Sequence, residues 1–140
     1  MEYITIEVQY AKKYGVTQAI VLHTLIYFVL KNKKENRNKK NGKYWTFNTY
    51  EGWREAMPFF TKYQIRNAMR SLRKQGAIIV GNFNKKGYDK TIWYTIDPIL
   101  LQEAQGQEYW KNRFTKRRKP SDKIVAPIPN KEYINIIEPY

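Results

Sequence analysis

The chain has 140 residues and a formal charge of +14, from 26 Lys and Arg against 12 Asp and Glu. This excess points to a polyanionic partner, most simply nucleic acid, while an apolar fraction of 42% suffices for one folded domain. The absence of Cys excludes disulfides and Cys nucleophiles, and the single His excludes a His-based metal cluster.

The positive charge is concentrated in four blocks of sequence. Residues 31–43 and 111–123 each carry a net +6, residues 60–76 carry +5 and residues 84–90 carry +2, whereas the rest of the chain is net −5. A surface that only keeps a protein soluble mixes both signs. The segregation therefore indicates dedicated cationic surfaces.

The first 30 residues predict two helices after a short alternating segment. Residues 3–8 alternate in polarity and form either a short strand or the lead-in to a helix. A helix is expected over residues 8–14, closed by Gly15. Thr17 is expected to cap a second helix that runs to Leu30 and is apolar almost all round, which is typical of a central, buried helix.

This second helix does not predict a membrane span. Its apolar run over residues 19–30 is shorter than the roughly 20 residues that a span needs. The N-terminus shows no export signal. We therefore expect a cytoplasmic protein with no membrane partner.

The next stretch predicts a basic loop, an aromatic strand and a short helix. Residues 31–43 lack apolar periodicity and end in an Asn-Gly turn signal, and residues 44–47 predict a strand. Asn48 is expected to cap the helix, with Glu51 as its capping-box partner, and Pro58 ends it. The apolar face of this helix is formed by Tyr50, Trp53 and Met57.

The clearest pattern is an amphipathic helix that a capping box opens at Thr61 and Gln64 and that ends at Gly76. Apolar residues at spacings of three and four form its inward face: Ile65, Ala68, Met69 and Leu72. The helix has no acidic residue, and its opposite face is basic: Lys62, Arg66, Arg70, Arg73 and Lys74.

Two strands and a short helix follow. Residues 77–81 and 91–96 predict a hairpin around a basic loop, and Pro98 opens a helix that reaches about Ala104. Residues 120–140 hold four prolines, which argues against a packed element there. We therefore expect a domain over residues 1–105, with the basic loop 31–43 inserted, and a basic, Pro-rich extension over residues 106–140.

The order helix, turn, basic helix, strand, basic loop, strand is the plan of a winged helix-turn-helix. It predicts an α+β fold with an N-terminal helical extension and a basic, Pro-rich C-terminal tail. In this plan the second helix lies in the major groove and the first supports it. A helix from Lys62 to Lys74 is about 18 Å long, enough to lie in a groove. The hairpin loop, or wing, reaches the neighbouring DNA backbone.

Several stretches carry a recognisable pattern: Val16-Thr17-Gln18-Ala19-Ile20-Val21-Leu22, Lys43-Tyr44-Trp45-Thr46-Phe47-Asn48-Thr49, Pro58-Phe59-Phe60-Thr61, Leu72-Arg73-Lys74-Gln75-Gly76 and Trp93-Tyr94-Thr95-Ile96-Asp97. The first stretch resembles the opening helix of replication proteins from phages and plasmids of Gram-positive bacteria, and the second resembles the block that follows it. The third and fourth resemble the helix-turn-helix of these proteins, and the fifth resembles their wing. The match covers about residues 4–100.

The resemblance implies a winged-helix domain of a replisome organiser or replication initiator, similar to the amino-terminal domain of DnaD-like primosomal proteins. Such domains bind DNA, self-associate, or both. Family members usually continue into a second, helical domain, whereas the basic, Pro-rich extension follows here. A repressor, an accessory factor or an inhibitor that reuses the fold therefore stays open.

We expect neither enzymatic activity nor a cofactor. A rolling-circle initiator needs paired metal-binding His residues, and a Ser/His/acid triad would need His23 beside Ser71 or Ser121. The chain has no Gly-x-x-x-x-Gly-Lys-Ser/Thr phosphate loop and no acidic cluster for a two-metal nuclease. His23 lies in the most apolar helix, so we expect a core or interface residue.

The predicted DNA contacts lie on the basic helix, in the wing and in the C-terminal extension. Arg66, Arg70 and Lys62 are assigned to the groove, with Tyr63 and Asn67 as candidate base readers. The remaining predicted contacts are Arg73, Lys74, Lys85, Lys86, Lys90, Arg117 and Arg118. Tyr88 in the wing is a further candidate. The other prominent aromatic residues are expected to pack in the core: Trp45, Trp53, Phe59, Phe60, Trp93 and Tyr94.

Two functional hypotheses follow. The first is a double-stranded DNA-binding protein of phage or plasmid replication. The second is a protein-binding module on the same fold, such as a phage-encoded inhibitor or adaptor that docks on a host or replisome nucleoprotein.

Residues 132–140 alternate apolar residues with two carboxylates, and they either add a strand to a partner's sheet or pack back on this domain or on a symmetry mate. A homodimer through the apolar first helices fits either hypothesis.

Overall fold

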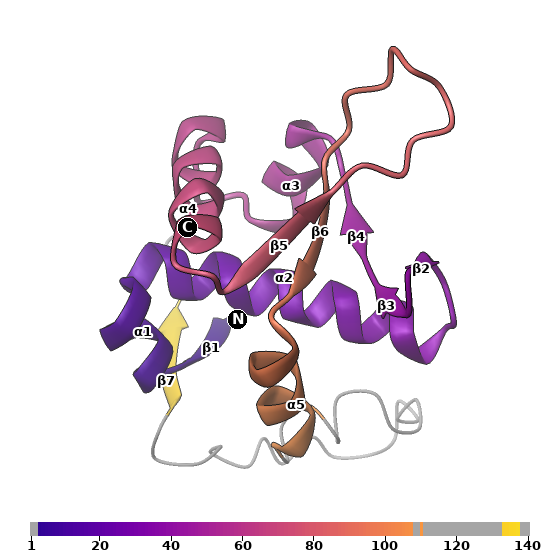
Figure 1. Ribbon diagram of the computed structural model, residues 1–140. Coiled ribbons are helices and arrows are strands. Elements are labelled where there is room, and N and C mark those ends of the chain that lie inside the picture. Colours follow the sequence, from indigo (N-terminus) through magenta and orange to yellow (C-terminus); the bar gives the residue numbers. More distant parts are fainter. Residues whose placement is uncertain (1–2, 108–109, 111–132, 138–140) are drawn as a thin grey trace, which may run out of the picture.

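A 19-residue helix, α2 (Val16–Lys34), runs through the centre of the molecule, and the other elements pack around it (Figure 1). The computed structural model describes residues 3–107, 110 and 133–137. Over these residues it contains five helices and three small antiparallel sheets, so the fold is mixed α+β, as predicted.

The predicted central helix is confirmed, but both of its ends differ from the prediction. The N-cap of α2 is Gly15, with φ of 98°, and no side chain caps the helix, so Thr17 lies inside the first turn. The helix ends at Lys34 rather than Leu30. Asn32 explains the extension, because it is buried and its amide donates a hydrogen bond to the Trp45 carbonyl at 2.8 Å. This tertiary contact extends the helix beyond its apolar run.

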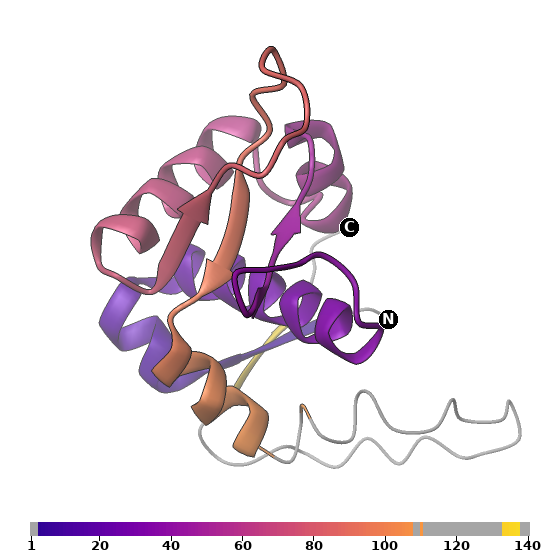
Figure 2. The same cartoon turned by 45° about the vertical axis from the view of Figure 1, so that its right-hand side comes forward.

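A three-stranded sheet covers one side of α2, with strand order β4 (Thr46–Phe47), β6 (Trp93–Ile96) and β5 (Ile78–Gly81). Both neighbours of β6 are antiparallel to it, which confirms the predicted hairpin between β5 and β6. The β5–β6 loop rises from the top of this sheet (Figures 1 and 2).

All four residues of β6 are buried, so both faces of this strand are covered. Tyr94 and Ile96 belong to the main core around α2. The other face is covered by an aromatic cluster: Trp45, Phe47, Phe83 and Trp93. Its ring centres lie 4.4 Å apart for Phe47–Trp93, 4.8 Å for Trp45–Phe83 and 5.4 Å for Phe83–Trp93. The sheet is therefore packed on both faces.

The predicted helix pair is present as α3 (Tyr50–Ala56) and α4 (Lys62–Lys74). Thr49 rather than Asn48 caps α3, because its hydroxyl accepts from the backbone N–H of Gly52 at 3.0 Å. Asn48 instead accepts a hydrogen bond from the Thr49 N–H at 2.9 Å. The helix stops just before Pro58, as predicted.

The segment between α2 and α3 is more ordered than a basic loop. It contains a hairpin of β2 (Lys39–Lys40) and β3 (Lys43–Tyr44), joined at the predicted Asn-Gly turn. The predicted aromatic strand is interrupted at Trp45, which separates β3 from β4.

The two ends of the described chain meet beneath α2. Strand β1 (Tyr3–Glu7) leads into α1 (Val8–Tyr14) and pairs antiparallel with β7 (Tyr133–Ile137). Helix α5 (Pro98–Gly106) confirms the predicted final helix. The expectation that residues 120–140 hold no packed element is wrong for β7, and Trp110 is buried in the main core. No helix in the described ranges is long and apolar enough to cross a bilayer.

Gly81 lets the aromatic cluster approach the backbone of β5. A Cβ at this position would lie 2.8 Å from Phe83 Cε2 and 3.0 Å from Trp45 Cζ3. The two rings pack on each other, so neither can withdraw freely, and Gly81→Ala should lower the free energy of unfolding by about 1–3 kcal/mol. A Cβ at Gly87 would meet nothing within 4 Å, so Gly87→Ala should change it by less than about 0.5 kcal/mol. Urea unfolding of both variants checks this, and equal effects would contradict it.

Candidate nucleic-acid interface

Local hydrogen bonds fix both ends of α4. The Thr61 hydroxyl accepts from the Gln64 N–H at 3.1 Å, and the Gln64 side chain accepts from the Thr61 N–H at 2.8 Å. After the helix, Gly76 (φ 78°) donates to the Arg73 carbonyl, and the next residue donates to the Leu72 carbonyl. These two bonds form a Schellman motif. The predicted capping box and the predicted stop are both confirmed.

Helix α4 buries its apolar face against α2 and α3, which leaves its basic face outside. The buried residues are the predicted ones: Ile65, Ala68, Met69 and Leu72. The exposed residues are Lys62, Tyr63, Arg66, Arg70, Arg73 and Lys74, with Asn67 half-buried between the two faces. The structure therefore gathers the seven predicted helix contacts on the exposed side of one rigid element.

Tyr50, the first residue of α3, supports two of these cations. Lys62 Nζ lies 5.3 Å, and the guanidinium carbon of Arg66 5.2 Å, from the centre of the Tyr50 ring. Both distances are typical of cation–π contacts. The spacing of apolar residues predicts only that Tyr50 lies on the apolar face of its own helix. It does not predict the contacts with Lys62 and Arg66, because these contacts join two helices.

Asn84 shapes the β5–β6 loop. Its Nδ2 donates to the carbonyls of Asp89 at 3.0 Å and Thr91 at 2.8 Å, and its Oδ1 accepts from Trp93 Nε1 at 2.8 Å. These bonds tie the loop to the sheet. They leave its three predicted contacts exposed: Lys85, Lys86 and Lys90.

The one acidic residue of this loop is engaged in holding the turn. The Asp89 carboxylate accepts from the Thr91 N–H at 3.0 Å. Hydrogen bonds from Thr91 lower the pKa of Asp89, and the nearby Lys86 lowers it further. Asp89 therefore stays ionised near neutral pH and gives the loop its shape.

Two tyrosines stand out from the cationic surface. Tyr63 on α4 is 70% exposed and Tyr88 in the β5–β6 loop is 76% exposed. Lys86 Nζ lies 5.7 Å from the centre of the Tyr88 ring. Exposed aromatic rings beside cations are suited to stacking against nucleic-acid bases.

A hollow of about 160 Å³ lies between α3 and the base of the β5–β6 loop. Tyr50 and Trp53 line it from α3, and Lys90 and Ile92 line it from the loop. Lys90 is therefore brought close to the ring that supports the α4 cations. Lys85 and Lys86 are not part of this lining.

Some residues considered in the sequence lie elsewhere. Arg117 and Arg118 fall outside the described residues. His23 is half-buried with its ring centre 4.9 Å from that of Trp110, which suits the predicted core or interface position.

Among the described residues, no group of three or more acidic or His side chains is placed to hold a metal. The predicted packing of the prominent aromatic residues is confirmed: Trp45, Trp53, Trp93 and Tyr94 are buried, and Phe59 and Phe60 pack against the core.

Comparison of the chain with models of protein families, with curated proteins and with solved structures finds no match. The resemblance to phage and plasmid replication proteins therefore stays a prediction from the sequence.

The raised pKa of Tyr94, a residue that lines the hollow, predicts that the stability of the fold depends on pH. Burial, with a smaller contribution from Tyr50, raises the pKa of Tyr94 to about 12, although Arg73 opposes the shift. The fold thus favours the neutral phenol, and this stabilisation is complete below the unfolded pKa of 10.0 and is lost as the pH rises toward 12. Urea unfolding between about pH 8 and 11 should show a steeper loss of stability for the wild type than for Tyr94→Phe. Parallel curves would contradict the assignment.

Proposed function

We propose that the protein binds double-stranded DNA through a winged helix-turn-helix. The helix pair is α3 and α4, and the wing is the β5–β6 loop. The element order and the position of α4 on α2 and α3 support this. So does the loop, which projects from the sheet next to the helix pair (Figure 2).

The observation that carries the proposal is the unneutralised basic face of α4. The helix has five exposed cations and no acidic residue. Within the described part of the chain, none of these five cations forms an ion pair, and the single ion pair there joins Arg37 and Glu35. Five unpaired cations on one folded helix suit a row of phosphates.

The placement of Lys62 strengthens the case for an anionic partner. This residue is the first of α4, whose first turn contains no acidic side chain. A helix N-terminus carries partial positive charge, so a cation there is unfavourable in the free protein and an anion is favourable. A DNA phosphate near the start of α4 would interact favourably with both Lys62 and the helix dipole.

The other proposed DNA contacts fall into two classes: residues that read bases and residues that bind the DNA backbone. Arg66 and Arg70 lie one turn apart and can reach guanine edges in the major groove, where Arg binds O6 and N7. Tyr63 and Asn67 are the further candidate base readers. The loop lysines hold the backbone, which positions the protein without reading sequence.

The role in replication rests on the sequence resemblance alone. On that ground we propose a phage or plasmid replication initiation or accessory factor, or a regulator that reuses the fold. The folded domain would act in duplex binding, which is the property that the geometry of α4 supports.

Replacement of the two central arginines of α4 tests the function. On random duplex DNA, where no guanine is matched to them, the two arginines would contact phosphates, and each phosphate contact adds about −0.9 to the log–log salt slope. Arg66→Ala plus Arg70→Ala should therefore flatten the slope by up to about 1.8 and weaken binding. Ala keeps the helix because of its high helix propensity. Fluorescence anisotropy across a salt series measures both quantities.

The matched control is Lys12→Ala plus Lys13→Ala, which removes two exposed cations from α1. We expect this control to bind duplex DNA as the wild type does. Unchanged affinity and slope in the Arg66→Ala, Arg70→Ala variant would show that α4 is not the DNA-binding element.

A further inference from the structure

A second cationic surface lies at the opposite end of α2 from α1, outside the predicted DNA contacts. We define the cationic hairpin as residues 37–44, which include β2 and β3. It follows three lysines in the last turn of α2: Lys31, Lys33 and Lys34. The helix dipole stabilises cations at a helix C-terminus, which accounts for the three lysines of α2. The dipole does not account for the exposed lysines of the hairpin: Lys39, Lys40 and Lys43.

Left-handed backbone positions fix the shape of the hairpin. Asn36 and Asn38 have φ of 52° and 58°, and the turn residues Asn41 and Gly42 have φ of 53° and 76°. Asn and Gly are the residues that tolerate this region, and two successive positive φ values define a type I′ turn. The hairpin thus has turn residues suited to its twist.

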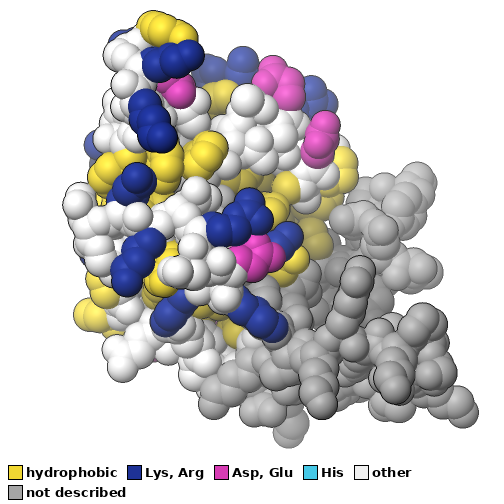
Figure 3. Space-filling model, turned by 90° about the vertical axis from the view of Figure 1, so that its right-hand side faces the viewer, with side chains coloured by type: hydrophobic (Ala, Val, Ile, Leu, Met, Phe, Trp, Pro, Cys, Tyr) yellow, Lys and Arg dark blue, Asp and Glu magenta, His cyan; other side chains and the backbone are white. Residues whose placement is uncertain are grey.

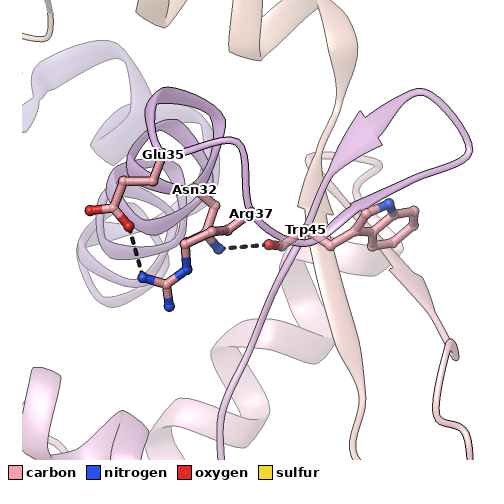
Figure 4. Close-up of polar contacts among 4 residues, drawn as sticks. All are labelled: Asn32, Glu35, Arg37 and Trp45. Atoms are coloured by element: carbon pink, nitrogen blue, oxygen red, sulfur yellow. Dashed lines mark hydrogen bonds and ion pairs between the residues drawn. The ribbon is translucent and has the colours of Figure 1, made fainter.

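Trp45 fastens the hairpin to the core. Its backbone N–H donates to the Asn38 carbonyl at 3.1 Å and its indole Nε1 donates to the Lys40 carbonyl at 3.0 Å. Its own carbonyl accepts from the buried amide of Asn32 at 2.8 Å, as Figure 4 shows. The Thr95 hydroxyl of the central strand donates to the Tyr44 carbonyl at 2.6 Å. The lysines therefore stand on a rigid support.

Among the residues that the structure describes, acidic side chains do not balance the charge of this surface. Glu35, the one acidic residue of segment 31–43, pairs with Arg37 at 2.9 Å (Figure 4). Lys40 and Lys43 lie directly opposite each other across the two strands. Like charges at such a pair repel each other and destabilise the hairpin. A bound anion would relieve this repulsion.

The aromatic cluster couples the cationic hairpin to the β5–β6 loop. Trp45 follows the hairpin, Phe83 belongs to the loop, and their ring centres lie 4.8 Å apart. Both elements lie on the right-hand side of the molecule in Figure 1. Figure 3 looks onto this side and shows Lys and Arg side chains spread over it, with fewer acidic ones among them.

We propose that the cationic hairpin is a second phosphate-binding site, which holds the backbone of the same DNA that α4 and the β5–β6 loop bind. This inference rests on the proposed function and extends its contact surface. The coupling to the loop favours one continuous DNA partner. The rigid support means that binding orders few additional groups. The hairpin supplies affinity without sequence specificity.

The test compares full-length variants on random duplex DNA by anisotropy across a salt series. Lys40→Gln plus Lys43→Gln removes the opposed charges and keeps most of each side chain's length. Loss of two phosphate contacts should flatten the log–log salt slope by about 1.8. Urea unfolding should show no loss of stability, because the substitutions remove a repulsive pair. The control, Lys12→Gln plus Lys13→Gln, removes the same charge from the far end of α2, which is about 28 Å long, and should leave the slope unchanged.

The outcomes separate this inference from the proposed function. A flatter slope in both the hairpin and the Arg66→Ala, Arg70→Ala variants supports the hairpin site as an extension of the α4 surface. A flatter slope in the hairpin variant alone supports phosphate binding by the hairpin and overturns the role of α4. An unchanged slope in the hairpin variant, with a flatter slope in the α4 variant, overturns the hairpin site and leaves the proposed function standing. Equal flattening by the Lys12, Lys13 control shows a general charge effect and overturns the site. Failure of the wild type to bind duplex DNA overturns both.

Discussion

The burial of α2 is the constraint on which the rest of the structure depends. Its apolar residues point in all directions, so every side of the helix has to be covered. Helix α4 covers one part, the β4–β6–β5 sheet another, and α1, β1 and α5 the remainder. Each covering element uses one face for this purpose. On α4 the opposite face is left exposed by the described elements, and that face carries the cations.

The sheet extends this principle into a second layer. Its inner face packs on α2, and its outer face is covered by the aromatic cluster of Trp45, Phe47, Phe83 and Trp93. Two of these rings come from β4 and β6, one lies in the β5–β6 loop and one follows the cationic hairpin. The small second core therefore sets the position of the loop relative to the hairpin. Cationic groups on such a fixed frame reach a partner with little loss of conformational freedom.

Features with local causes could be predicted from the sequence. The start, the end and the two faces of α4 follow from Thr61, Gln64, Gly76 and the spacing of apolar residues, which all act within a few positions. The hairpin of β5 and β6 and the Pro-initiated α5 follow in the same way. Their agreement with the structure reflects the short range of the interactions that form them.

Features that depend on distant partners were missed. The last turn of α2 depends on the Asn32–Trp45 hydrogen bond, and β7 depends on a partner about 130 residues earlier. The alternative caps at Asn48 and Thr49 differ by one residue, and the hydroxyl of Thr49 took the bond that was assigned to Asn48. The cationic hairpin had a readable signal in three Asn residues with left-handed backbone, Asn36 just before it and Asn38 and Asn41 within it. The spacing of these Asn residues indicates turns with a defined backbone conformation, whereas the composition indicates only that the segment is basic.

The two cationic surfaces share a physical feature that links them to one kind of partner. Lys62 opposes the dipole at the start of α4, and Lys40 faces Lys43 across the hairpin. Each arrangement costs the free protein about a few tenths of a kcal/mol. Neither contributes to the core, and neither is offset by a carboxylate in the described part of the chain. A polyanion interacts favourably with both, and anything that binds only the folded state stabilises it. The same unpaired cations that slightly destabilise the free fold would therefore couple its stability to the binding of the proposed DNA partner.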